Sequence, residues 1–249
     1  MNIRLAVGVA ICVFSAPATG VAGQLQGSAS EPLQEYEHRA QAYELFIRSL
    51  RLEDSGDVVR AIDLLSRAAD LDPNAAAILA AQAALYVQVG QTTDAIRVAE
   101  RALILDADYS QAHRVLGLIF ATLSEQALEQ RDSRGSSDAE MYRGRALTHL
   151  EQAVIAGEPD GRITFILARL YVETGAVDKA VVTLEPFVRD RPGFVDGLLL
   201  LTRAYVESGR LAEAVETLEE AARSRPRSVR MLNALAELYE STERWREAA

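Results

Sequence analysis

Residues 195–226 read VDGLLLLTRAYVESGRLAEAVETLEEAARSRP, and this spacing predicts two helices separated by a glycine turn. The first helix has a face of side chains at i, i+3, i+4, i+7 and i+8, namely Leu198, Leu201, Thr202, Tyr205 and Val206. Gly209 ends this helix, because a left-handed backbone is cheap only for glycine. The second helix covers 211–223, with Ala214 and Ala221 where two helices cross closely, and Pro226 stops it.

The same landmarks recur along the chain with a period of 34 residues. Glycines that end first helices stand at Gly56, Gly90, Gly175 and Gly209. Alanines of the second helices stand at Ala61, Ala95, Ala146, Ala180 and Ala214, and apolar or aromatic residues of the first helices at Leu52, Tyr86, Phe120, Tyr171, Tyr205 and Tyr239. Each series steps by 34 residues except across the third unit, which is 17 residues longer. One pair of helices cannot bury both of its faces, so we expect the pairs to stack on one another.

The period and its landmarks closely resemble the tetratricopeptide repeat (TPR). The best match to the family pattern is Leu116-Gly117 followed by Phe120, and related pairs precede Tyr171, Tyr205 and Tyr239. The early tryptophan of the family is replaced by Leu79, His113, Thr164, Leu198 and Leu232. The resemblance covers residues 42–249, and it implies an all-α fold, an α–α superhelical solenoid of helix–turn–helix repeats.

We expect five whole repeats and part of a sixth, at 42–75, 76–109, 110–160, 161–194, 195–228 and 229–249. The 17 extra residues of the third unit lie around 123–145. There we expect the first helix to continue through residue 130, a polar loop at 131–137, and a second helix opened by the capping box Ser137-Asp-Ala-Glu140. Such an insertion is either a neutral extension or a docking projection. The last unit ends where its second helix should begin, so we expect a longer protein to continue beyond Ala249.

The N-terminus has the layout of a secretory signal peptide, which we assign to residues 1–22. A short basic start with Arg4 precedes ten largely apolar residues at 5–14 and a run of small residues at 15–23. The apolar run is shorter than the roughly 20 residues that a membrane span needs. We therefore expect an exported bacterial protein, periplasmic or secreted, with no integral span after cleavage; an uncleaved N-terminal membrane anchor is the alternative. Residues 23–35 are expected to form a linker and 36–249 the solenoid.

Composition argues against most chemical functions. A formal net charge of −10 disfavours a general nucleic-acid partner, and the single cysteine excludes an intrachain disulfide and a cysteine-based zinc site. Phosphate-binding, zinc-protease and serine-hydrolase motifs are missing from the sequence. We therefore expect no catalytic residue, no cofactor, no metal and no enzymatic activity. His113 and His149 share the third unit and could approach each other, for which packing is a better explanation than a ligand pair.

The TPR resemblance implies that the first helices bind a peptide or a partner helix on the concave face of the solenoid. Mapped onto this chain, the family's binding positions include Tyr43, Phe46, Gln111, Arg114, Arg162, Arg169, Arg203, Arg230 and Asn233. An apolar N-terminal half and an arginine-bearing C-terminal half fit an acidic amphipathic segment, because the planar guanidinium binds carboxylates bidentately. The alternative is that these arginines form ion pairs with neighbouring Glu173, Glu207 and Glu237.

The function expected from these features is a noncatalytic protein–protein interaction scaffold or adaptor of the bacterial cell envelope. The alternative is that the repeats are the N-terminal recognition region of a longer protein, either an enzyme or an outer-membrane export or secretion component.

Overall fold

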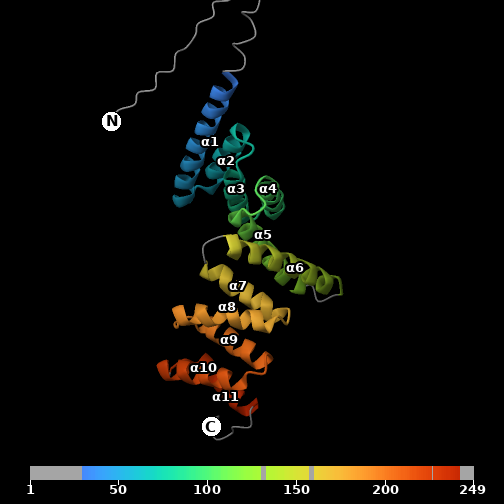
Figure 1. Cartoon of the computed structure of the whole chain (residues 1–249), viewed down its shortest axis with the longest axis vertical. Coiled ribbons are helices and arrows are strands. Elements are labelled where there is room, and N and C mark those ends of the chain that lie inside the picture. Colours follow the sequence, from blue (N-terminus) through green and yellow to red (C-terminus); the bar gives the residue numbers. More distant parts are fainter. Residues whose placement is uncertain (1–29, 130–132, 157–159, 226, 242–249) are drawn as a thin grey trace, which may run out of the picture.

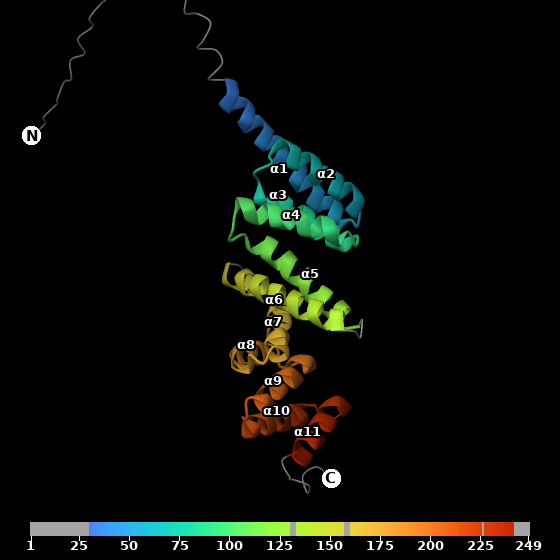
Figure 2. The same ribbon diagram turned by 90° about the vertical axis from the view of Figure 1, so that its right-hand side faces the viewer.

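The computed structural model describes residues 30–129, 133–156, 160–225 and 227–241, and these ranges contain eleven helices and no strand. The helices are α1 (Ser30–Asp54), α2 (Val58–Leu71), α3 (Ala76–Gln88), α4 (Thr92–Leu105), α5 (Ser110–Glu129), α6 (Ser133–Ala156), α7 (Gly161–Glu173), α8 (Val177–Asp190), α9 (Val195–Glu207), α10 (Leu211–Ser224) and α11 (Val229–Ser241). Each helix packs against the next one along the chain. Figures 1 and 2 show the resulting stack, which runs from α1 at one end to α11 at the other. The predicted all-α solenoid is confirmed.

Glycine ends the first helices of four units, as the period predicts. Gly56, Gly90, Gly175 and Gly209 have φ angles of 82°, 76°, 75° and 76°. After Gly209, the backbone N–H of Arg210 donates to the carbonyl of Tyr205 at 2.8 Å, which closes the αL turn that ends many helices. Each of these turns reverses the direction of the chain, so the second helix of the unit packs alongside the first.

The alanine series marks the helix crossings. Ala61, Ala95, Ala146, Ala180 and Ala214 are all completely buried. A second series joins consecutive units: the hydroxyls of Tyr171, Tyr205 and Tyr239 donate to carboxylates that stand 20 residues earlier, on Glu151, Glu185 and Glu219. Burial and the bond to Glu185 raise the pKa of the Tyr205 hydroxyl to about 12. The tyrosine ring therefore packs in the core while its hydroxyl ties each unit to the one before it.

The third unit is lengthened in both helices, as predicted, but its second helix begins earlier than predicted. Helices α5 and α6 have 20 and 24 residues, compared with 13 and 14 in α7 and α8. The predicted loop is wrong at 133–137, and so is the capping box at Ser137, because α6 already begins at Ser133; residues 131–132 lie outside the described residues. Gly135 and Ala139 are buried and continue the face of α6 that carries Ala146. Packing of this small-residue face against α5 outweighs the poor helix propensity of the glycine and serines.

The first helix also begins earlier than predicted. Helix α1 starts at Ser30, so residues 30–35 are helical rather than part of a linker. Residues 42–53 anchor this helix on α2, and extending an anchored helix avoids the cost of nucleation. Residues 1–22, the predicted signal peptide, lie outside the described residues, as do the predicted linker residues 23–29. Within the described ranges, none of the helices has both the length and the hydrophobicity that crossing a membrane requires.

Candidate functional site

The first helices of the units line the inner side of the solenoid. Helix α3 contacts α5, α5 contacts α7, α7 contacts α9 and α9 contacts α11, although each pair is separated by an intervening second helix. Consecutive second helices make no comparable contacts within the described residues. Because the first helices approach one another more closely, the stack curves toward them, and they form its concave face.

This face contains a groove of about 560 Å³ between α3, α5 and α7. Apolar side chains from all three helices line it: Val87 from α3, Leu118 from α5, and Phe165 and Ile166 from α7. Its polar lining consists of Thr92, Thr122, Glu125, Gln126, Arg162 and Arg169. The sequence therefore folds into an open groove that has an apolar wall and two arginines in its lining.

The nine predicted binding residues do not form a single site. Arg162 and Arg169 both line the main groove. Arg203 lines a separate hollow between α9 and α11, and Gln111 and Arg114 line a smaller one beside Asp160. Tyr43 and Phe46 form an edge-to-face pair on α1, with their ring centroids 6.5 Å apart, and Arg230 and Asn233 lie on α11.

Most of the predicted arginines already have a carboxylate partner. Arg114 pairs with Asp160 at 3.2 Å, Arg203 with Glu207 at 2.7 Å and Arg230 with Asp196 at 2.6 Å. Arg169 pairs with both Glu125 and Glu173. Among the ion pairs of the described residues, none involves the guanidinium of Arg162, whose backbone N–H alone bonds to Asp160. Four of the five arginines therefore form ion pairs, of which only those of Arg169 and Arg203 use the predicted Glu173 and Glu207. Arg162 lines the groove without such a pair.

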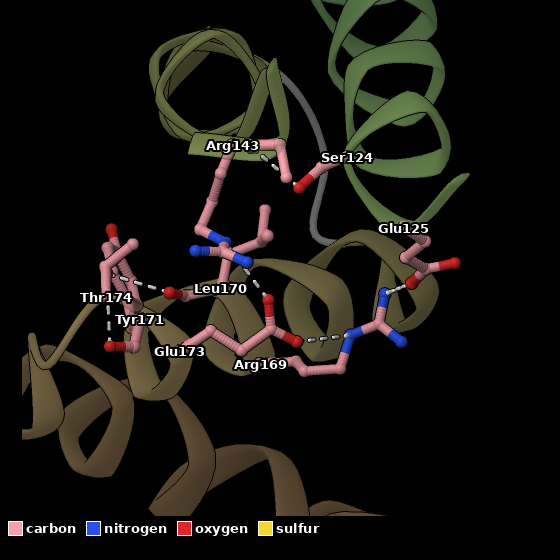
Figure 3. A network of polar contacts seen from close by, with 9 residues as sticks. Ser124, Glu125, Arg143, Arg169, Leu170, Tyr171, Glu173 and Thr174 are labelled. Atoms are coloured by element: carbon pink, nitrogen blue, oxygen red, sulfur yellow. Dashed lines mark hydrogen bonds and ion pairs between the residues drawn. The ribbon is translucent and has the colours of Figure 1, made fainter. Parts of the chain in front are cut away.

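Figure 3 shows how Arg169 is held. Its Nη2 atom reaches the carboxylate of Glu125 on α5, and its Nε atom lies 3.7 Å from Glu173 on its own helix. Glu173 is also 3.4 Å from the Nε atom of Arg143, which comes from α6 and is largely buried. This network joins three helices at one end of the groove, so Arg169 is a fixed part of the wall rather than a free cation.

Two histidines lie in contact inside the third unit. The Nδ1 atoms of His113 and His149 are 3.0 Å apart, and Nε2 of His113 is 2.9 Å from the carbonyl oxygen of Ala107. A carbonyl can only accept, so His113 carries its proton on Nε2 and accepts the Nδ1–H of His149. Burial, followed by the electrostatic interactions with His113 and Arg145, lowers the pKa of His149 from 6.5 to about 4. The imidazole of His149 is therefore neutral at pH 7, and it packs against the rings of His113 and Phe120.

This pair predicts an acid-sensitive third unit. The unfolded chain protonates His149 near its ordinary pKa of 6.5, but the folded chain resists protonation down to a pKa of about 4. The free energy of unfolding is therefore highest above pH 6.5, and it falls as the pH drops toward 4. One pKa unit corresponds to about 1.4 kcal/mol, and partial exposure reduces the loss to roughly 1–2 kcal/mol. Urea unfolding of the wild type and of His149→Gln at pH 7 and 4.5 measures it, and an equal pH dependence of both proteins contradicts the assignment.

Comparisons with known proteins agree with the repeat assignment. Two sequence profiles of the tetratricopeptide repeat match residues 52–119 and 199–249. No curated protein matches the sequence. Among solved structures, YrrB, described as a TPR protein with an unusual peptide-binding site, superposes with a TM-score of 0.61 at 20% identity, covering 83% of this chain and 97% of YrrB.

Two further TPR structures show the same architecture. The MamA protein aligns with a TM-score of 0.54 at 21% identity, over 76% of this chain and 94% of MamA. A tetratricopeptide repeat protein from Parabacteroides merdae ATCC 43184 aligns with a TM-score of 0.56 at 16% identity, over 84% of this chain and 76% of that protein. At these identities the likeness concerns the fold. The chain therefore carries tetratricopeptide repeats, which stack into an all-α solenoid.

Proposed function

We propose that this protein is a noncatalytic protein–protein interaction scaffold, which binds a peptide segment or a partner helix in the groove between α3, α5 and α7. The observation that carries the proposal is the position of Arg162, a cation without a carboxylate partner among the described residues, beside the apolar side chains of Phe165 and Ile166. Apolar grooves with a few fixed polar groups are the usual form of a peptide site. The unusual peptide-binding site of YrrB, a protein of the same fold, supports this use of the solenoid.

The ligand chemistry follows from the lining of the groove. Val87, Leu118 and Phe165 offer an apolar surface for one or two anchoring side chains. Arg162 offers a bidentate donor to one carboxylate, whereas Arg169 is already shared by Glu125 and Glu173. The groove therefore fits a segment in which one acidic residue follows an apolar anchor. The groove is therefore expected to select a segment with a single acidic residue rather than a strongly acidic one, because four of the five arginines are already paired with carboxylates.

The proposed cellular location of this scaffold depends on residues 1–22. We propose that they direct export, and that the solenoid works in the periplasm or outside the bacterial cell. A fusion of residues 1–29 to a reporter that is active only after export tests this proposal. Activity of the fusion is expected, and it is expected to disappear when two apolar residues of the stretch 5–14 are replaced by arginine. An inactive wild-type fusion contradicts export.

An array of short peptides that combine aliphatic or aromatic residues with one acidic residue tests the groove. Peptides that bind the wild-type chain are measured by fluorescence anisotropy against Arg162→Glu, and we expect a loss of affinity on the order of tenfold or more, because the new carboxylate repels the acidic residue. Arg67→Glu is the matched control, since Arg67 lies on α2, outside the groove. Equal affinity of the wild type and Arg162→Glu, or loss of affinity in Arg67→Glu, contradicts the site.

A further inference from the structure

Helix α1 is much longer than the helix that packs against it. It has 25 residues and α2 has 14, so at about 1.5 Å per residue it extends well beyond its partner. Figure 1 shows the N-terminal part of α1 projecting from the end of the stack. All residues from Leu33 to Gln41 are exposed. The projecting part therefore keeps its apolar side chains in solvent.

Those apolar side chains form a regular stripe, with spacings of 3, 4, 3, 4 and 3 residues. Its members are Leu33, Tyr36, Ala40, Tyr43, Ile47 and Leu50, and the five large ones are 65%, 73%, 53%, 47% and 37% exposed. Alternating spacings of three and four residues are the a and d positions of a coiled-coil heptad. A surface helix packs into the core through one apolar face, so this additional apolar stripe is not explained by packing within the solenoid.

The stripe lies on the side of α1 opposite the side chains that pack this helix onto α2. The side chains that pack α1 onto its neighbours are Ala42, Leu45, Phe46, Ser49 and Leu52, which are buried or partly buried. At 3.6 residues per turn, the centre of the stripe is roughly 150° around the helix from the centre of this packed face. The stripe residues of the projecting part, from Leu33 to Ala40, are therefore open to a second helix, whereas Tyr43 also interacts electrostatically with Tyr109, just before α5.

We propose that this stripe is the seam of a parallel two-stranded coiled coil with the α1 helix of a second copy of the chain. A heptad seam is self-complementary, since each a or d side chain meets the same residue of a parallel partner. The charges beside the seam agree with this orientation. Arg39 is at a g position and Glu44 at the following e position, so in a parallel pair each Arg39 faces a Glu44 of the other copy.

The antiparallel arrangement is less favourable. In an antiparallel pair whose six stripe residues all meet a stripe residue of the other copy, Glu37 of one copy faces Glu44 of the other. This contact of like charges occurs twice. Within one chain, Arg39 pairs with Glu35 at 2.8 Å and Arg48 with Glu44 at 3.6 Å, and all four side chains are more than half exposed. Exposed pairs of this kind contribute little, so both can exchange for pairs between copies.

A membrane surface is a poorer occupant of the same stripe. Helices that lie in a bilayer interface are rich in lysine and arginine on their polar face. Helix α1 instead carries six carboxylates against three arginines, Arg39, Arg48 and Arg51. Anionic lipids therefore gain no net attraction from it.

Sedimentation equilibrium of the purified chain over a range of concentrations tests the dimer. We expect the mass to rise from that of one chain to twice that value. Tyr36→Glu combined with Ile47→Glu, which would place carboxylates in the seam, is expected to raise the dissociation constant roughly 100-fold or more. The matched control is Val59→Glu combined with Val182→Glu, which alters side chains of similar exposure (74% and 73%) away from the stripe.

Orientation is tested by charge and by cross-linking. Arg39→Glu alone is expected to weaken the dimer, and adding Glu44→Arg is expected to restore it. In a Cys12→Ser background, Tyr36→Cys is expected to give a disulfide-linked dimer, because a parallel seam places the two residues 36 opposite each other. Three results would overturn the proposal. The first is a chain that stays monomeric at about 100 µM, and the second is a dimer that the Tyr36 and Ile47 substitutions leave unaffected. The third is binding to anionic vesicles that depends on the stripe and occurs without dimerisation. Arg162→Glu is expected to leave the dimer unchanged, which separates it from the groove.

Discussion

Replacing Gly117 with leucine is expected to destabilise the protein by about 3 kcal/mol or more, whereas the same change at Gly144 is expected to be neutral or slightly stabilising. A Cβ atom at position 117 would lie only 2.5 Å and 2.6 Å from the Cδ2 and Cγ atoms of Leu150, and 3.2 Å from its backbone nitrogen. Leu150 is completely buried in α6, so it has no free volume into which it can move. Close packing of α5 on α6 therefore depends on the absence of a side chain at Gly117.

Gly144 is the internal control for this experiment. It is also helical, in α6, but it is exposed, and a Cβ atom built there meets no atom within 4 Å. Leucine is a better helix former than glycine by up to about 1 kcal/mol, so this variant shows the propensity gain alone. Thermal and urea unfolding measure both variants, and Gly117→Ala should fall between the wild type and Gly117→Leu. Equal stability of the two leucine variants contradicts the helix contact.

The parts of the fold that follow from local residue chemistry can be predicted from the sequence. Gly209 and its three equivalents adopt the left-handed conformation that their spacing implies, and Ala214 with its equivalents is buried at a crossing. Both properties depend on residues within one unit, and the 34-residue period repeats them. The period is therefore sufficient to predict the solenoid without any long-range contact.

Features that depend on neighbouring units cannot be read in this way. The hydrogen bond from Tyr205 to Glu185 joins positions 20 residues apart, a separation that no helical periodicity contains. Only the recurrence of glutamate at 151, 185 and 219 indicates it. The start of α6 differs from the expectation because Ser137 fits a capping box locally, while burial of Ala139 against α5 decides the outcome. Local capping preferences amount to about 1 kcal/mol, less than the packing of a helix face.

The position of the candidate site is easier to predict than its chemistry. Mapping the concave positions locates Arg162 and Arg169 in the groove between α3, α5 and α7. Spacing indicates the pair of Arg169 with Glu173, four residues along the same helix, but not its pair with Glu125, which lies 44 residues away. The side-chain geometry of three helices decides which arginine remains open. The sequence therefore shows that the groove contains arginines but not which of them is available to a ligand.

Phe120 connects the repeat pattern to the histidine pair, and replacing it with alanine is expected to cost about 3–5 kcal/mol. The ring is 1% exposed and stacks on Tyr142 and His149, with centroid distances of 6.2 Å and 5.8 Å. The guanidinium carbon of Arg145 lies 3.8 Å from its centroid, so the substitution also removes a cation–π contact. Urea unfolding measures the loss, and Phe120→Leu, which keeps most of the volume, is expected to lose less than half as much.

The same substitution should change the titration of His149. Burial is the main cause of its low pKa, and the ring of Phe120 covers one face of the imidazole. Removing the ring admits water, so we expect the pKa of His149 to rise from about 4 toward 6.5. Because the folded and unfolded values then approach each other, the loss of stability between pH 6.5 and 4 becomes smaller. NMR titration of the imidazole measures the pKa directly. An unchanged pKa in a folded Phe120→Ala protein would mean that the electrostatic interactions with His113 and Arg145, rather than burial, keep this histidine neutral.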